Sequence, residues 1–192
     1  MKYFFKKSEK KFFDIKFWSG INNEKENIIL FPLRREKYKG ADIILSALDK
    51  VRQELVNFKF VGFGNLDKSK VPIWIEYYKE ISNDNLRVLY SKSKIFVLPS
   101  RVEGFPLVNL EAMANRCAVI STKFEGYETY LVNCLNAMLV ENENIDELAK
   151  TIVNLSRDDI LIKKLGLHGK KTAMNYSEDN MVSEFIKIID TN

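Results

Sequence analysis

Apolar residues along the chain fall into short continuous runs that alternate with longer segments of helical spacing. The runs occupy residues 28–33, 58–64, 94–99, 117–121 and 137–140, with a shorter one at 72–75. Continuous runs are typical of parallel strands that are covered on both faces. The segments between them predict helices at about 40–55, 86–90, 145–155, 160–173 and 178–189. This alternation predicts an α/β fold, a doubly wound parallel sheet of about six strands.

Composition agrees with a single α/β unit. The chain has 192 residues, 46% of them hydrophobic and 29% charged, which is enough to bury a substantial core. No apolar run approaches the roughly 20 residues that span a bilayer. The net charge of +4 comes from both signs mixed along the chain, so nucleic-acid binding is not indicated. Cys117 and Cys134 lack metal-ligand spacing, which argues against zinc and agrees with a reducing cytoplasm.

The segment 100–114 carries two carboxylates in unusual positions. Glu103 lies in a loop after the 94–99 strand, and Glu111 lies in a helix that begins at Pro106 and is otherwise apolar. Apolar residues would surround that helix, so Glu111 needs a polar partner. Open α/β sheets bind ligands at this edge of the sheet. Free N–H groups at the helix start would bind phosphate, and Glu111 would reach sugar hydroxyls one turn later.

A second candidate segment is the basic loop after the 28–33 strand. Lys39 lies at the amino end of the next helix, where a cation opposes the helix dipole. An anion held between Lys39, Arg34 and the helix end would resolve that conflict. A solvated basic loop is the simpler alternative. Arg35 adjoins Arg34, so either arginine could serve.

These residues together resemble a known family. The sequence P-S-x-x-E-G-F-P followed by E-A-M-A, with Glu103 and Glu111 in an E-x7-E spacing, is similar to the motif of retaining glycosyltransferases of the GT-B fold, family 4. The family pattern R-x4-K-G falls on Arg34, Lys39 and Gly40. The resemblance covers residues 20–190 and implies one Rossmann-like half of a GT-B fold, the half that binds a nucleotide sugar.

The resemblance implies roles for individual residues. Arg34 and Lys39 would bind the donor diphosphate, and Glu103 would lie beside the donor sugar. These three are the predicted catalytic residues. The predicted donor-binding set is Arg34, Lys39, Gly104, Phe105, Leu107 and Glu111. Cations and backbone amides would stabilise the leaving diphosphate, so no metal and no cofactor besides the nucleotide sugar is expected.

The start of the chain predicts a domain boundary. The tripeptide at 20–22 resembles the element that joins the two halves of such transferases. By this resemblance residues 1–22 are an N-terminal segment or linker remnant, and residues 23–192 are the donor-binding domain. The acceptor domain would be missing from this chain and would act in cis or in a partner chain. The isolated domain is expected to be inactive or weakly active.

The expected function is transfer of a hexosyl group, with retention, from a UDP- or GDP-sugar during polysaccharide biosynthesis in the cytoplasm or at the inner face of the membrane. Two alternatives stay open. The chain could be a non-catalytic nucleotide-sugar-binding subunit or a truncated remnant, or it could be an epimerase or phosphorylase. The lysine- and aromatic-rich residues 2–18 could lie on an anionic membrane or dock on the domain.

Three further positions carry expectations. After E-A-M-A the family usually has glycine, and Asn115 is expected to adopt the left-handed turn in its place. The family element G-G-x-x-E becomes E-G-Y-E-T at 125–129, which alters the surroundings of the donor sugar. His168, the only histidine, is expected to be structural.

Overall fold

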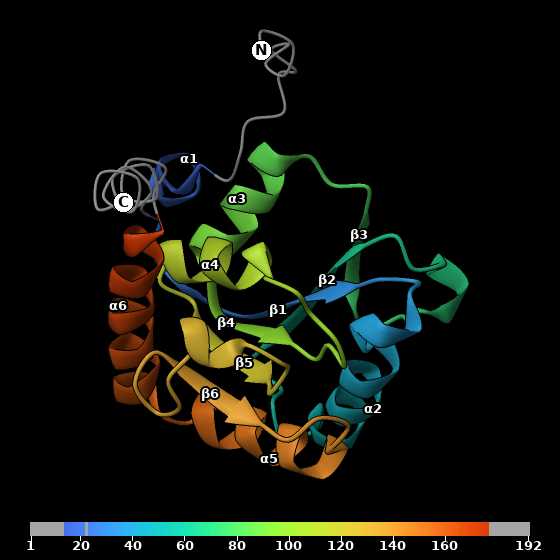
Figure 1. Cartoon of the computed structure of the whole chain (residues 1–192). Coiled ribbons are helices and arrows are strands. Elements are labelled where there is room, and N and C mark those ends of the chain that lie inside the picture. Colours follow the sequence, from blue (N-terminus) through green and yellow to red (C-terminus); the bar gives the residue numbers. More distant parts are fainter. Residues whose placement is uncertain (1–13, 22, 177–192) are drawn as a thin grey trace, which may run out of the picture.

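The computed structural model describes residues 14–21 and 23–176. Six parallel strands form one sheet in the order β3-β2-β1-β4-β5-β6 (Figure 1). The strands are β1 Glu26–Leu33, β2 Lys59–Gly64, β3 Glu76–Lys79, β4 Ser93–Leu98, β5 Ala118–Thr122 and β6 Ala137–Val140. The predicted α/β class and the parallel sheet are confirmed. The strand order reverses between β1 and β4, which creates a topological switch point.

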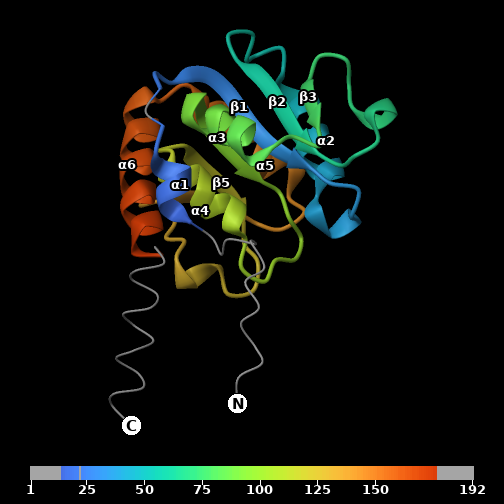
Figure 2. The ribbon, with the colours of Figure 1, turned by 90° about the horizontal axis from the view of Figure 1, so that it is seen from above.

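Helices cover both faces of the sheet. They are α1 Ile15–Ser19, α2 Ala41–Val51, α3 Asn83–Lys92, α4 Leu107–Ala114, α5 Ile145–Ser156 and α6 Asp159–Asn175, with short 3-10 turns at Lys37–Lys39, Lys68–Lys70 and Tyr127–Thr129. Figure 1 shows α1, α3 and α4 on one side of the sheet and α2 and α5 on the other, and Figure 2 shows the first group from above. The fold is therefore a three-layer sandwich.

Buried apolar side chains form one cluster on each face of the sheet. In β1, Ile29, Phe31 and Leu33 pack toward α2 and α5, whereas Ile28 and Leu30 pack toward α3 and α4. Both sets are at least 95% buried. Each such side chain contributes about 1.5–3 kcal/mol on burial. The two-sided cover explains why the strands are apolar without alternation.

One predicted strand was misplaced. Residues 72–75 form a turn in which the Ile75 amide donates to the Pro72 carbonyl at 3.0 Å, and β3 begins only at Glu76. Ile73 is fully exposed, while Trp74 packs edge-on against Phe60 at 5.5 Å. The apolar residues cover the sheet edge from a turn. The edge strand itself is mostly polar and exposed, so it gives no apolar signal.

Helices α2 and α4 also differ from the expectation. The first ends at Val51 rather than near Leu55, because the chain turns after Arg52 and buries Leu55 beneath it. The second begins after Pro106, which acts as its N-cap, and its first turn is not enclosed, since Leu107 is 40% exposed. The apolar pattern could not show that this turn borders a cavity.

The left-handed residue after α4 is Arg116 (φ 59°), not Asn115 (φ −90°, ψ 10°) as expected. The Asn115 side-chain amide donates to the Glu111 carbonyl at 2.9 Å. This bond keeps Asn115 in the last helical turn and moves the reversal one residue onward.

The N-terminal segment belongs to the packed domain from residue 15. Asp14 caps α1, Ile15 and Trp18 are buried, and Trp18 meets the Tyr90 ring edge-on at 5.7 Å. Part of the segment expected to be a linker remnant therefore docks on the domain. The boundary at residues 22 and 23 stays a prediction. Residues 2–13 and the predicted helix at 178–189 lie outside the described residues.

Among residues 14–21 and 23–176, no helix combines the length and apolar character needed to cross a membrane.

We expect Trp18→Ala to lower the free energy of unfolding by about 3–5 kcal/mol, because it removes a large side chain from a packed face. Urea unfolding followed by circular dichroism measures this change. Ile73→Ala is the control and should shift stability by less than about 0.5 kcal/mol. Equal effects of the two substitutions would show that α1 is not part of the folded domain.

Candidate functional site

Two loops meet at the carboxyl edge of the sheet, at the switch point between β1 and β4. One joins β1 to α2 and the other joins β4 to α4. A cavity of about 420 Å³ lies between them. Its wall includes Arg34 and Lys39 from the first loop and Glu103, Phe105 and Leu107 from the second. Both segments singled out in the sequence thus face one shared cavity.

Arg101 ties the two loops together. Its backbone amide donates to the Tyr38 carbonyl at 2.7 Å, and its guanidinium donates to the Lys37 carbonyl at 2.6 Å. The same guanidinium makes a bidentate pair with the Asp42 carboxylate, with both distances 2.9 Å. Hydrogen bonds from Arg101 lower the pKa of Asp42 from its ordinary value. Bidentate arginine–carboxylate pairs have fixed geometry, so this pair fixes the position of one loop relative to the other.

Gly40 sets how closely the loops approach. It is left-handed (φ 69°), and a Cβ atom there would lie 1.9 Å from the Pro99 carbonyl oxygen. A similar restriction applies at Gly64 (φ 143°), where a Cβ atom would lie 2.2 Å from the Leu33 oxygen. Only glycine fits either position. The end of β2 therefore approaches the backbone of β1 closely.

Lys39 and Glu103 form an ion pair across the cavity wall. The Lys39 ammonium donates to both carboxylate oxygens of Glu103, at 2.9 and 2.8 Å. The Glu103 side chain is 7% exposed and that of Lys39 is 29% exposed. Glu103 therefore supplies the negative charge that the sequence required beside the amino end of α2. A phosphate entering the cavity would share the same ammonium.

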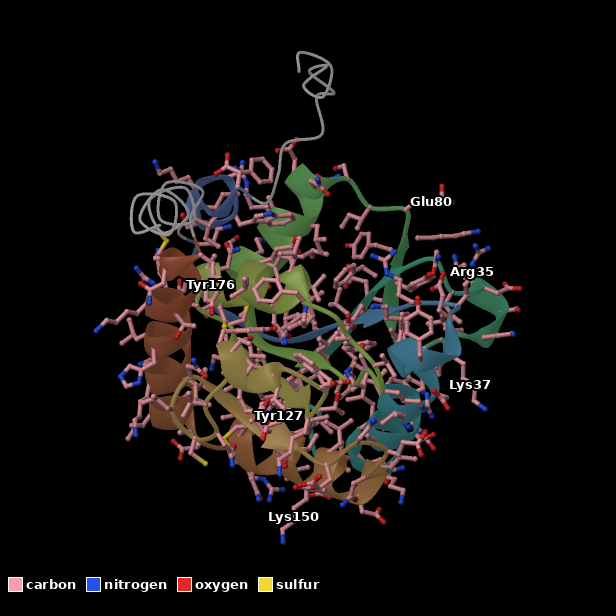
Figure 3. All side chains as sticks on the ribbon, viewed as in Figure 1. Arg35, Lys37, Glu80, Tyr127, Lys150 and Tyr176 are labelled. Carbon is pink, nitrogen blue, oxygen red and sulfur yellow. The ribbon has the colours of Figure 1, made fainter. Side chains whose placement is uncertain are left out.

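The two adjacent arginines point in different directions. Arg34 lines the cavity. The Arg35 side chain is 77% exposed, lies 3.4 Å from the Glu36 carboxylate and points outward in Figure 3. Of the two alternatives that the sequence left open, the geometry selects Arg34 as the residue that faces the cavity.

Glu111 has the polar partner that its position in α4 demands. The Tyr90 hydroxyl donates to the Glu111 carboxylate at 3.1 Å, from a ring that is completely buried. Burial raises the pKa of Glu111 to about 7, although the Tyr90 hydrogen bond and the charge of Arg34 oppose the shift. Glu111 is partly exposed and is not among the residues that line this cavity. Tyr90 lies on a different helix, so no local sequence pattern identified it as this partner.

Three aromatic rings support the loop after Glu103. The Phe105 ring is 44% exposed and lies 5.3 Å from the Tyr130 ring and 5.6 Å from the Tyr176 ring, between centroids. Tyr130 accepts a hydrogen bond from the Asn109 amide at 3.1 Å, and Tyr176 donates to the Thr129 carbonyl at 2.8 Å. This cluster anchors the loop after Glu103 to the end of α6. Sequence analysis missed it because its members are far apart in the chain.

The other predicted site residues can also be placed. Gly104 lies in the same loop but is not among the cavity-lining residues, and His168 lies on α6 outside the cavity. Within residues 14–21 and 23–176, no group of three His, Cys, Asp or Glu side chains could hold a metal ion.

Comparison with known proteins decides the family. A model of glycosyl transferases group 1 matches residues 12–172. The chain belongs to this family. An uncharacterized glycosyltransferase of Methanocaldococcus jannaschii is 30% identical over 187 residues, which cover 90% of this chain and 52% of the relative.

Other relatives have names that describe a reaction. A Campylobacter jejuni protein named N,N'-diacetylbacillosaminyl-diphospho-undecaprenol alpha-1,3-N-acetylgalactosaminyltransferase is 27% identical, across 91% of this chain and 47% of its own. The glycosyltransferase chain described here therefore spans about half the length of the curated relatives it matches.

Solved structures confirm the fold as that of one GT-B half. The C-terminal domain of a glycosyl transferase group 1 protein from Francisella tularensis superposes with a TM-score of 0.69 at 24% identity, covering 81% of this chain and 87% of that domain. A TarM variant from S. aureus, crystallised with UDP, gives a TM-score of 0.74 at 21% identity over 87% of this chain and 36% of its own.

We expect Gly40→Ala to destabilise the transferase domain by more than about 1–2 kcal/mol, because alanine is strained at this φ and would also overlap the Pro99 carbonyl. Thermal and urea unfolding measure the loss. Gly104→Ala is the matched control in the facing loop, where an added Cβ meets no atom within 4 Å. An unchanged stability for Gly40→Ala would contradict the close approach of the two loops.

The raised pKa of Glu111 predicts a pH-dependent stability difference. A carboxyl whose folded pKa is about 7 destabilises the fold only when ionised, so the penalty is absent below its ordinary pKa of 4.5 and complete above pH 7. Glu111→Gln should therefore gain stability relative to the unsubstituted domain as pH rises from 4.5 to 7. The gain should approach about 1.4 kcal/mol per pH unit within that window.

Urea unfolding at several pH values measures this difference, because groups common to both proteins cancel. The control repeats the Glu111→Gln comparison in the Tyr90→Phe protein. Tyr90→Phe removes a hydrogen bond that lowers the Glu111 pKa, so the pH range over which the stability difference grows should move upward. A difference between Glu111→Gln and the unsubstituted domain that is constant with pH would contradict the shift.

Proposed function

We propose that residues 23–192 form the donor-binding half of a retaining glycosyltransferase that moves a hexosyl group from a nucleotide diphosphate sugar to an acceptor. The single observation that carries this proposal is the shared cavity at the switch point, where Arg34, Lys39, Glu103 and the start of α4 converge. The acceptor-binding half is supplied in cis or by a partner chain.

The donor diphosphate would lie between the two cations and the start of α4. The first N–H groups of a helix have no acceptor within it, and the helix dipole favours an anion at that end. The N–H groups of Gly104, Phe105 and Leu107 would therefore join Arg34 and Lys39 around the phosphates. Negative charge grows on the diphosphate as the glycosidic bond breaks. Each preorganised hydrogen-bond donor that faces this charge typically accelerates the reaction by on the order of 10²–10³.

Glu103 is proposed to contact the donor sugar through hydroxyl groups. Its carboxylate is almost buried and is held by Lys39 at both oxygens, so its position is fixed before a donor enters. Because the same ammonium would contact the phosphate, Lys39 would link the sugar site to the diphosphate site. Arg34, Lys39 and the backbone N–H groups would together supply the positive charge that a metal ion provides in other enzymes. The reaction is therefore proposed to be metal-independent.

Glu111 is proposed to bind ribose hydroxyls from behind the diphosphate. The Tyr90 hydroxyl fixes one of its oxygens at 3.1 Å and leaves the second for a ligand. A UDP- or GDP-sugar is the proposed donor. The TarM variant that shares this fold was crystallised with UDP, which supports a UDP-sugar over a GDP-sugar.

The pathway proposed is polysaccharide or glycolipid assembly at the cytoplasmic face of the membrane. Relatives support it by name: the Campylobacter jejuni transferase acts on a diphospho-undecaprenol, and a Bacillus subtilis relative, 28% identical across 86% of this chain and 26% of its own, is a poly(glycerol-phosphate) alpha-glucosyltransferase.

We expect Lys39→Ala to weaken binding of a nucleoside diphosphate by roughly 10- to 100-fold and to leave binding of the free nucleoside nearly unchanged. The reason is that a charge-assisted hydrogen bond is worth about 1.5–3 kcal/mol and contacts only the phosphates. Isothermal titration calorimetry with uridine and guanosine, each as nucleoside and diphosphate, measures both affinities. Equal weakening of both ligands would refute the phosphate role.

The adjacent arginines give a matched comparison for the same measurement. Arg34→Ala should weaken diphosphate binding, whereas Arg35→Ala should not, because only Arg34 lines the cavity. Lys37→Ala serves as the equivalent control for Lys39, since Lys37 is exposed, points outward in Figure 3 and does not line the cavity.

A further inference from the structure

A second cavity, of about 480 Å³, lies at the opposite edge of the sheet from the donor cavity. Its wall is built from the segment before β1, the start of β4, the turn after α4 and one side of α6 (Figure 1). The cations in this wall are Lys25, Lys94, Arg116, Lys163 and Lys170. None of them belongs to the glycosyltransferase motifs.

Positive charge in this cavity exceeds what the protein itself neutralises. Lys94 is paired with Asp159 at 2.7 Å, and the Lys25 ammonium donates to the Tyr90 and Ser93 carbonyls at 3.0 and 2.7 Å. Glu24 is the other acidic residue in the wall. In the part of the chain that the structure describes, the side chains of Arg116, Lys163 and Lys170 make no hydrogen bond or ion pair, although the charge of Lys163 helps to lower the pKa of Asp159. Arg116 and Lys163 are exposed at the mouth of the cavity.

The cations also affect one another. Burial lowers the pKa of Lys170, and the nearby charge of Arg116 lowers it further. Burial likewise lowers the pKa of Lys25, with a smaller contribution in the same direction from Arg116. Like charges held together in a hollow repel each other unless an anion lies between them. The cavity therefore has the electrostatic character of an anion site.

A buried acceptor gives independent evidence of a ligand with a hydroxyl group. Asn115 lines the cavity and is 5% exposed, and its side-chain oxygen accepts no hydrogen bond, although its amide donates to the Glu111 carbonyl. Buried acceptors normally have a donor. Ala114, Ile162 and Leu167 supply an apolar wall beside it. A phosphate alone would not use this acceptor or this wall.

We propose that this cavity binds a small soluble phosphate monoester whose carbon skeleton carries a hydroxyl group. The phosphate would lie among Arg116, Lys163 and Lys170, and the hydroxyl would donate to Asn115. The start of α4 borders the donor cavity, and its end borders this one. Because α4 has eight residues, its two ends are about 12 Å apart. The two sites are separate, so both can be occupied together.

The test is calorimetric titration of the full chain with glycerol 3-phosphate, carried out in the Arg34→Ala/Lys39→Ala protein so that the donor cavity does not contribute. We expect saturable binding of one equivalent. Arg116→Asn/Lys163→Gln/Lys170→Gln should then weaken it at least about tenfold, because three charge-assisted contacts are lost. Asparagine at position 116 tolerates the left-handed backbone there, so the fold is kept.

Lys37→Gln/Lys150→Gln removes two exposed lysines elsewhere and should leave the affinity unchanged. Inorganic phosphate should bind more weakly than glycerol 3-phosphate, and Asn115→Leu should abolish that preference. No binding, or binding that the triple variant leaves intact, would overturn the proposal. Binding only to vesicles of phosphatidylglycerol would also overturn it and would assign the charge to a membrane surface. UDP affinity of the unsubstituted chain tests the donor site separately.

Discussion

The candidate site depends on the contact between the loops that follow β1 and β4. Arg101 contacts the Lys37 and Tyr38 carbonyls of the other loop and the Asp42 carboxylate at the start of α2. Gly40 allows the two backbones to touch beside Pro99. Without this contact the cations of one loop and the carboxylate of the other would belong to separate surfaces. The ion pair of Lys39 with Glu103 follows from that contact and could not hold the loops together alone, since its ammonium remains partly exposed.

Much of the fold could be predicted from the sequence because two-sided burial leaves a strong apolar signal. β1, β2, β4, β5 and β6 were predicted to within two residues at each end, and the sheet class followed from their alternation with helices. The edge strand β3 was missed for the opposite reason, because a polar strand at an exposed edge resembles a loop. The reversal at Arg116 was placed one residue early because it depends on a side-chain bond of Asn115 that no pattern reveals.

The candidate site was predictable where its residues are close in sequence. Arg34, Lys39 and Glu103 were found from short motifs, and the structure places them around one cavity. Tyr90, Tyr130 and Tyr176 were not found, because they approach the site from three different elements and only through the folded chain. Arg101 was also overlooked: it lies inside the quoted motif, but its partners Lys37 and Asp42 are about 60 residues away along the chain.

Tyr90 contacts several elements at once. Its ring packs against Trp18, Phe63 and Phe96, its hydroxyl holds Glu111, and its carbonyl accepts from the partly buried Lys25. The chain that leads into β1 thus rests on the same residue that orients the Glu111 carboxylate. Movement of that entering segment would therefore displace a carboxylate on α4, well away from it along the chain.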